Sequence, residues 1–333
     1  MILVMCIVFF LSRSEVTTQR SFNTLKIYSR TVRKSSKNKL KMFAESNWFR
    51  EIPHSLKLYT PTLVSNYRES SDYATYDLEY LYLLPLSDLL VFSEIPITSW
   101  RNILTECRDL IQRFKAYTSD SSVTNIDCKL VDKIYLEKSL DRLASIEDKP
   151  IEVFINKCGY SLYDNSNYKN SVEELLLSVS QAVSEVSTCD LSIIHGDFCF
   201  SNILYDSRVQ SIKVIDPRGL DAQGKISIYG DSRYDVAKLY HSIVGFYDFI
   251  ISGHYSIKNK KLEFSVSQTG SSLEQLFDEI FFDNHLFRKD EIIAINVMLF
   301  LSMIPLHDDQ PTRQQAMFLN AVRLAQKLRE GSK

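Results

Sequence analysis

The chain has 333 residues, of which 45% are hydrophobic and 24% are charged, and its formal net charge at pH 7 is −2. This composition predicts a globular protein long enough to bury one or two hydrophobic cores. A nearly neutral chain supplies no broad surface for neutralising phosphates, so the charge balance argues against a nucleic-acid-binding protein.

The N-terminal segment, residues 1–13, begins with a run of eleven apolar residues. A helix needs about 20 apolar residues to cross a bilayer, so this run is too short to be a membrane span. No Lys or Arg precedes the run and no Ala-x-Ala-like site follows it, which disfavours a cleaved export signal. We interpret the segment as a buried strand or helix, or as residues added by an upstream start codon, rather than as a membrane anchor.

The six cysteines show no paired metal-ligand spacing, and a chain of this length needs no disulfide bonds to fold. Both features favour a reduced, cytoplasmic protein. The sequence leaves the oligomeric state open.

Two short β-prone runs, at residues 25–28 and 31–34, precede a helix that the sequence predicts over residues 38–49. Lys34 ends the second run and Glu45 lies within the helix, and we expect their side chains to form an ion pair. The alternative is that Lys34 belongs to a solvated basic face, because four other basic residues crowd this stretch.

Residues 76–90 have the pattern of a strand, a short connection and the start of a helix, for which Ser87 and Asp88 are N-cap candidates. Beyond them, apolar residues recur at helical spacing and alternate with polar segments. They predict three helices, at residues 100–117, 131–146 and 172–186, and polar loops at residues 119–127 and 165–171. No internal repeat or low-complexity linker separates these elements, which favours one continuous unit over independent domains.

The most informative segment is a short loop between two apolar, β-prone runs at residues 191–194 and 203–205. The loop contains Asp197 and, five residues later, Asn202, and a further apolar run ends at Asp216. Phosphoryl transfer requires hard oxygen ligands for Mg²⁺ and a group that orients the attacking hydroxyl. Asn202 and Asp216 suit the first task and Asp197 suits the second, so the spacing predicts a phosphoryl-transfer site.

This segment resembles the signature of the aminoglycoside phosphotransferase and choline kinase superfamily, whose members are relatives of the protein kinases. The resemblance is carried by His195-Gly196-Asp197 with Asn202, and by Ile215-Asp216-Pro217. It implies that Asp197 is the catalytic base and that Asn202 and Asp216 bind Mg²⁺.

Two further residues are expected to support this loop. Residues 230–239 resemble the next segment of the family, in which an Asp that opens a helix ties down the catalytic loop, and this role is implied for Asp235. His195 is expected to make a structural hydrogen bond within the loop, because a His that acts as a base needs a positioned partner.

The resemblance implies an α+β, bilobal, protein-kinase-like fold. A small β-rich nucleotide-binding lobe with its hinge would occupy residues 14–86, and a larger, mainly helical catalytic and acceptor-binding lobe would occupy residues 87–333. In such a fold Lys34, paired with Glu45, would hold the α- and β-phosphates of ATP.

The hinge of this fold would bind adenine through its backbone, and Glu79 and Leu81 are the candidate residues. A buried core strand without ligand contacts is the alternative for this segment. The Gly-x-Gly-x-x-Gly loop of protein kinases is absent, since no glycine occurs before Gly159. This departure favours a small-molecule kinase over a protein kinase.

Acceptor-binding candidates lie after Asp216 and in an aromatic stretch at residues 239–249. The resemblance implies that helices after the metal loop form the acceptor pocket, which suggests Tyr240, His241 and Tyr247, although an aromatic stripe at helical spacing also suits a buried core. The Arg218 guanidinium could clamp a phosphate or carboxylate bidentately. An ion pair of Arg218 with Asp221 or Asp231 is the structural alternative.

The sequence therefore predicts an ATP- and Mg-dependent kinase that transfers the γ-phosphoryl group to a hydroxyl of a small molecule. The acceptor would be a sugar, polyol, amino-alcohol or aminoglycoside-like compound, with a role in surface polysaccharide synthesis as one interpretation. A protein kinase and a non-catalytic pseudokinase scaffold are the alternatives. The preference for ATP over GTP stays open.

Overall fold

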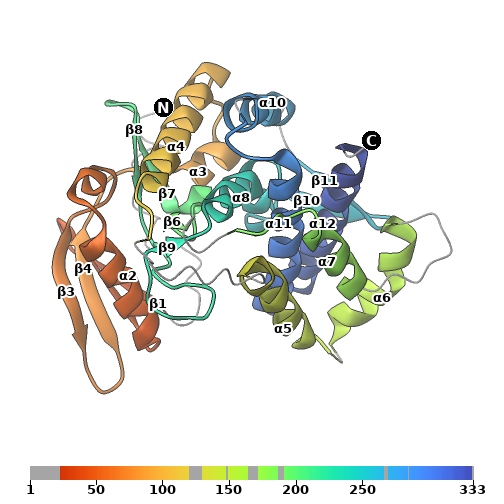
Figure 1. Cartoon of the computed structure of the whole chain (residues 1–333), viewed down its shortest axis with the longest axis horizontal. Coiled ribbons are helices and arrows are strands. Elements are labelled where there is room, and N and C mark those ends of the chain that lie inside the picture. Colours follow the sequence, from red (N-terminus) through yellow and green to blue (C-terminus); the bar gives the residue numbers. More distant parts are fainter. Residues whose placement is uncertain are drawn as a thin grey trace, which may run out of the picture.

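The computed structural model describes residues 23–119, 130–147, 149–163, 172–186, 191–265, 269–283 and 285–331. A small N-terminal part built on a β-sheet lies beside a larger part that is mainly helical (Figure 1). This arrangement confirms the bilobal α+β fold. Residues 1–13, and the predicted loops at residues 120–127 and 165–171, lie outside the described residues, and the lobe boundaries stay a prediction.

The N-terminal sheet has four antiparallel strands in the order β1-β2-β4-β3. The two predicted strands are β1 and β2, and Lys34 on β2 lies opposite Tyr76 on β4. Helix α2 (Lys39–Glu51) packs on this sheet, and the Asn38 side chain caps it by accepting the Lys41 backbone N–H. The strands are β1 (Asn23–Ile27), β2 (Thr31–Ser36), β3 (Leu63–Glu69) and β4 (Ala74–Glu79).

Two small sheets hold the ends of the loop that contains Asp197. β6 (Ser192–Ile193) pairs with β9 (Tyr229–Gly230) before the loop. After the loop, β7 pairs with both β5 and β8. The segment that follows the N-terminal sheet, β5, therefore lies directly beside the strand that follows the loop. These last elements are β5 (Leu84–Pro85), the 3₁₀ turn η4 (Phe200–Asn202), β7 (Ile203–Asp206) and β8 (Ser211–Val214).

The larger part is organised around α11 (Lys289–Met303), which is buried from residue 291 to residue 303 and packs against α5, α7, α8 and α12. The three helices predicted for the region before β6 are α4, the π-helical turn η2 with α5, and α7, which ends six residues earlier than predicted. Their bounds, with those of the other helices, are α3 (Leu86–Phe92), α4 (Ile97–Lys115), η2 (Asp132–Glu137), α5 (Lys138–Ala144), α6 (Pro150–Tyr163), α7 (Val172–Ser180), α8 (Ser232–Ile243), α9 (Tyr247–Ile251), α10 (Thr269–Phe281) and α12 (Pro311–Gly331). The hairpin strands β10 (Tyr255–Lys258) and β11 (Lys261–Phe264) and the 3₁₀ turns η1 (His54–Tyr59) and η5 (Ile304–His307) complete the described elements.

One described helical stretch, Lys289–His307, is long and apolar enough to cross a membrane by length and composition alone. However, 83% of its apolar window is buried inside the protein. A helix that is apolar all round and covered by other helices is typical of a core, so the stretch is weak evidence for a membrane span.

Candidate active site

Asp197 and Asn202 contact each other within the loop between β6 and β7. The Asn202 side-chain amide donates to the Asp197 carboxylate at 3.0 Å and to the Asp197 carbonyl at 2.9 Å. The Asp197 side chain remains 41% exposed, so an acceptor hydroxyl can reach it. Because the Asn202 side-chain nitrogen donates its hydrogen bonds to Asp197, the amide oxygen is the atom that can act as a metal ligand.

Asp216 follows Ile215, whose backbone N–H donates to the Asn202 carbonyl at 3.0 Å. This bond brings the backbone before Asp216 to Asn202. The Asp216 backbone is left-handed, with φ of 59°, a conformation that is uncommon outside glycine and is concentrated at functional sites. Although burial opposes ionisation, the charge of Lys34 lowers the pKa of Asp216. The carboxylate is therefore ionised at neutral pH, as metal coordination requires.

The donor set of Asp216 and Asn202 fits Mg²⁺ bound together with a nucleotide. Among the residues that the structure describes, no group of three or more His, Cys, Asp and Glu side chains gathers into a complete metal centre. Mg²⁺ does not need one, because it keeps several waters and binds substrate phosphates alongside one or two protein oxygens.

Lys34 links the N-terminal sheet to this segment. Its ammonium lies 2.6 Å from Glu45 on α2 and 3.0 Å from Asp216, and the Tyr76 hydroxyl donates to Glu45 at 2.7 Å. Burial alone would lower the pKa of Lys34, but Asp216 and Glu45 raise it above its ordinary value. The expected ion pair with Glu45 is present, and Lys34 is buried rather than part of a solvated basic face.

Helix α2 also contacts the loop that contains Asp197. The Trp48 indole N–H donates to the Ile194 carbonyl at 2.7 Å, and the Trp48 ring packs edge-on against the His195 ring. At Gly219, where φ is 63°, an added Cβ would lie 2.2 Å from the Ala44 carbonyl oxygen. Only glycine allows α2 to approach the segment after Asp216 this closely.

Asp235 and His195 contact the loop as their expected supporting roles require. Asp235, buried on α8, accepts the backbone N–H groups of His195 at 2.7 Å and Gly196 at 2.8 Å. The His195 Nδ1 atom accepts the Asp197 N–H at 3.3 Å. Burial lowers the pKa of His195 to about 4, so its ring is neutral and acts as an acceptor within the loop.

Replacing Asp235 with alanine is expected to lower both stability and turnover. Two buried N–H donors would lose their acceptor, at about 1–3 kcal/mol each, and the loop that holds Asp197 would loosen. Urea denaturation and kcat measured on the same preparation test this, with Asp72→Ala in the exposed turn between β3 and β4 as control. Unchanged stability and turnover would show that Asp235 does not hold the loop.

Sequence reasoning missed Lys238, whose ammonium lies 2.8 Å from the Asp197 carboxylate. Burial opposes the charge of Lys238, but Asp197 raises the pKa of Lys238 above its ordinary value. The available signal was helical spacing, because Lys238 follows Asp235 by three residues and therefore shares its face of α8. Asp197 is thus held between Lys238 and Asn202.

The two hinge candidates, Glu79 and Leu81, differ in the hydrogen bonds that they already make. The Glu79 N–H donates to the Thr62 carbonyl at 2.9 Å, and the Glu79 carboxylate accepts the Thr62 hydroxyl at 3.0 Å. These bonds engage the Glu79 N–H and carboxylate within the sheet, and an adenine contact through its carbonyl stays a prediction. Leu81 lies in the connection after β4, where its backbone makes no hydrogen bond to other described residues. Its role as an adenine contact stays a prediction.

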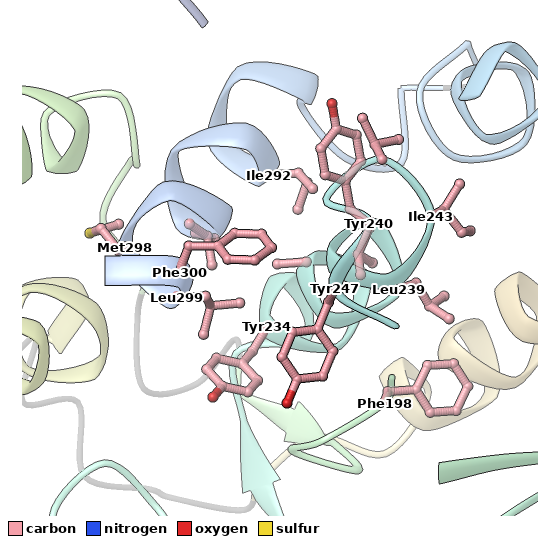
Figure 2. Packing of buried hydrophobic residues seen from close by; sticks show 14 of the residues in the cluster. Phe198, Tyr234, Leu239, Tyr240, Ile243, Tyr247, Ile292, Met298, Leu299 and Phe300 are labelled. Atoms are coloured by element: carbon pink, nitrogen blue, oxygen red, sulfur yellow. The ribbon is translucent and has the colours of Figure 1, made fainter. Parts of the chain in front are cut away.

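Two of the aromatic acceptor candidates belong to the core. Tyr240 and His241 are 0% exposed, and His241 is packed between Tyr247 and Phe300. Figure 2 shows the Tyr240 hydroxyl on the side opposite those of Tyr234 and Tyr247. The acceptor role predicted for Tyr240 and His241 is therefore wrong in this conformation, because α11 and its neighbours cover that face of α8. Tyr247, 8% exposed, stays a candidate.

Arg218 forms neither of the ion pairs considered as its structural alternative. Asp231 is bound by Arg233 and by the Tyr135 hydroxyl, and Asp221 accepts backbone N–H groups of its own turn. The Arg218 guanidinium instead lies 5.9 Å from the centroid of the Tyr234 ring. Arg218 remains a candidate for binding the acceptor.

No protein-family model matches the chain, and no curated protein matches its sequence. Solved structures do match it over nearly its whole length. A thermostable mutant of aminoglycoside phosphotransferase APH(4)-Ia, in the apo form, matches with a TM-score of 0.57 and 13% identity over 95% of this chain and 94% of that one. Spectinomycin phosphotransferase APH(9)-Ia, in complex with ADP and spectinomycin, matches with a TM-score of 0.55 and 9% identity over 94% and 91%.

A third structure, the GDP and kanamycin complex of an APH(2″) enzyme, matches with a TM-score of 0.53 and 12% identity over 99% of this chain and 100% of that one. The chain therefore has the fold of the aminoglycoside phosphotransferases, as the motif resemblance predicted.

Proposed function

We propose that this protein is an ATP- and Mg-dependent phosphotransferase that acts on a hydroxyl group of a small molecule. The observation that carries the proposal is the convergence of Lys34, Asp216, Asn202 and Asp197, which come from two parts of the chain. It is supported by the fold, since solved structures that share it bear the names of phosphotransferases and hold ADP or GDP.

Each residue has a defined task in this proposal. Lys34, oriented by Glu45, binds nucleotide phosphates, while Asp216 and Asn202 hold Mg²⁺, which neutralises charge on the phosphate oxygens when bound. Asp197 orients the acceptor hydroxyl and takes its proton. The hydroxyl oxygen forms a new bond to the γ-phosphorus, and the bond from that phosphorus to the leaving ADP oxygen breaks.

The acceptors we propose are sugars, polyols, amino-alcohols and aminoglycoside-like compounds, and the proposed location is the cytoplasm, where ATP is supplied. A role in surface polysaccharide synthesis is part of the same proposal. The decisive experiment measures ADP release from ATP, and GDP release from GTP, against a panel of these acceptors and of their carboxylate and phosphate derivatives, with Asp197→Ala as the inactive control. Acceptor-dependent ADP release is expected, and its absence across the panel would favour the pseudokinase alternative.

Replacing Asp216 with asparagine is expected to remove the dependence of nucleotide binding on Mg²⁺. A neutral amide would replace the charged oxygen ligand, and Lys34 would lose one of its two carboxylate partners. Calorimetry with ADP should show binding about ten-fold or more tighter with Mg²⁺ in the wild type and no such gain in the variant. Asp72→Asn serves as a charge-matched control, and an undiminished Mg²⁺ effect would exclude Asp216 as a ligand.

A further inference from the structure

The Tyr234 ring, at the start of α8, lies among three cationic side chains beside Asp197. The Lys138 ammonium is 5.7 Å and the Arg218 guanidinium 5.9 Å from the ring centroid. Lys238, one helical turn further along α8, reaches the Asp197 carboxylate at 2.8 Å. Positive charge therefore gathers next to the candidate catalytic base.

Arg218 is held against the catalytic loop itself. Its backbone N–H donates to the His195 carbonyl at 2.8 Å. A Cβ added to Gly196 would lie 2.7 Å from the Arg218 Cβ, so the stem of the arginine packs on the residue preceding Asp197. Arg218 is thus held against the same loop that carries the candidate base, Asp197.

The positive charge of this cluster is only partly compensated. Among the described residues, no carboxylate forms a salt bridge with Lys138 or Arg218, whereas Lys238 is paired with Asp197. The effect on Tyr234 gives the sign of the local potential. Although burial favours the neutral phenol, Lys138, Arg218 and Lys238 lower the pKa of Tyr234 to about 8. The cluster therefore favours the binding of an anion in addition to the Asp197 carboxylate.

We propose that the acceptor carries a carboxylate or phosphate group, which binds Arg218 and Lys138 while its hydroxyl reaches Asp197. The inference rests on the proposed phosphotransferase function and narrows its substrate class. Arginine binds planar or tetrahedral oxyanions bidentately, and lysine adds a point charge. The same charges repel a polycationic acceptor, so aminoglycosides are disfavoured as substrates.

The test compares three probes with one carbon skeleton: glycerol, glycerate and glycerol 3-phosphate. Calorimetry is performed on the full chain saturated with a non-hydrolysable ATP analogue and Mg²⁺, so that the nucleotide phosphate site is filled. We expect glycerate or glycerol 3-phosphate to bind and glycerol to show no measurable binding, and the stronger of the two anions identifies the group. Arg218→Gln and Lys138→Gln should each weaken anion binding about ten-fold or more. Arg208→Gln, in the exposed turn between β7 and β8, should not.

Three results would overturn the inference: no binding of either anion, equal binding of glycerol, or anion binding unchanged in Arg218→Gln. A loss of affinity for the ATP analogue in Arg218→Gln, with anion binding retained, would assign the cluster to the nucleotide instead. The outcomes separate this inference from the proposed function. Anion binding without ADP release from any acceptor would overturn the phosphotransferase function alone, whereas ADP release only with neutral or cationic acceptors would overturn the anionic acceptor alone.

Discussion

Turnover of the Asp197→Ala variant is expected to fall by about two to four orders of magnitude, the usual contribution of a positioned general base. The acceptor hydroxyl would lose both its orientation and its proton acceptor. Affinity for ADP and Mg²⁺ should change little, because Lys34 and Asp216 contact each other without Asp197. Steady-state kcat and calorimetric ADP binding, measured on one preparation, check both parts.

Because Asp197 is paired with Lys238, the Asp197→Ala variant needs a control for its effect on stability. Removing the carboxylate leaves the ammonium of Lys238, a residue that is 7% exposed, without its partner, so some loss of stability is expected. Asp197→Asn with Lys238→Met removes both charges and should be better folded than Asp197→Ala, yet equally inactive. Near-normal turnover in either variant would remove Asp197 from the role of base.

The Lys34→Met variant is expected to lose turnover and stability together. An exposed cleft lysine would contribute little to folding, but Lys34 is 4% exposed and lies between Glu45 and Asp216. Breaking a buried ion pair by removing one partner costs about 3–5 kcal/mol, because the remaining charge stays buried. Urea denaturation and ADP-release assays on the variant measure the two losses.

A second substitution separates these effects. Lys34→Met combined with Glu45→Gln removes the unpaired charge, and the Tyr76 hydroxyl can still donate to the amide oxygen at position 45. Stability should recover in part, while turnover should stay absent because no cation contacts the nucleotide phosphates. A double variant that regained turnover would show that Lys34 serves the fold alone.

Residues close in sequence could be predicted because their chemistry is local. Asp197 and Asn202 share one short loop, and β-prone runs fix both of its ends, so their contact follows from spacing. The ion pair of Lys34 with Glu45 was also accessible, since a strand followed by a helix that packs on the same sheet brings the two side chains together.

Other features depend on how distant elements pack. Lys238 reaches Asp197 because α8 packs against the loop that contains Asp197, and its spacing from Asp235 was the one local sign of that approach. Tyr240 and His241 lie on a stripe that could have faced either solvent or core, and the positions of α10 and α11 decide that they are buried. The surroundings of Lys34 likewise combine Glu45 from α2 with Asp216 from a distant segment.

The packing of α2 on the loop that contains Asp197 bears on how the protein folds. Trp48 is fully buried, and it donates its indole N–H to Ile194 while packing against His195. The close approach of Gly219 to Ala44 continues the same contact. Melting of α2 would break these contacts and expose the His195 ring. The N-terminal sheet and the loop should therefore gain or lose structure in one cooperative step. A fragment beginning after the hinge would consequently lack Trp48, which contacts the loop at Ile194 and His195.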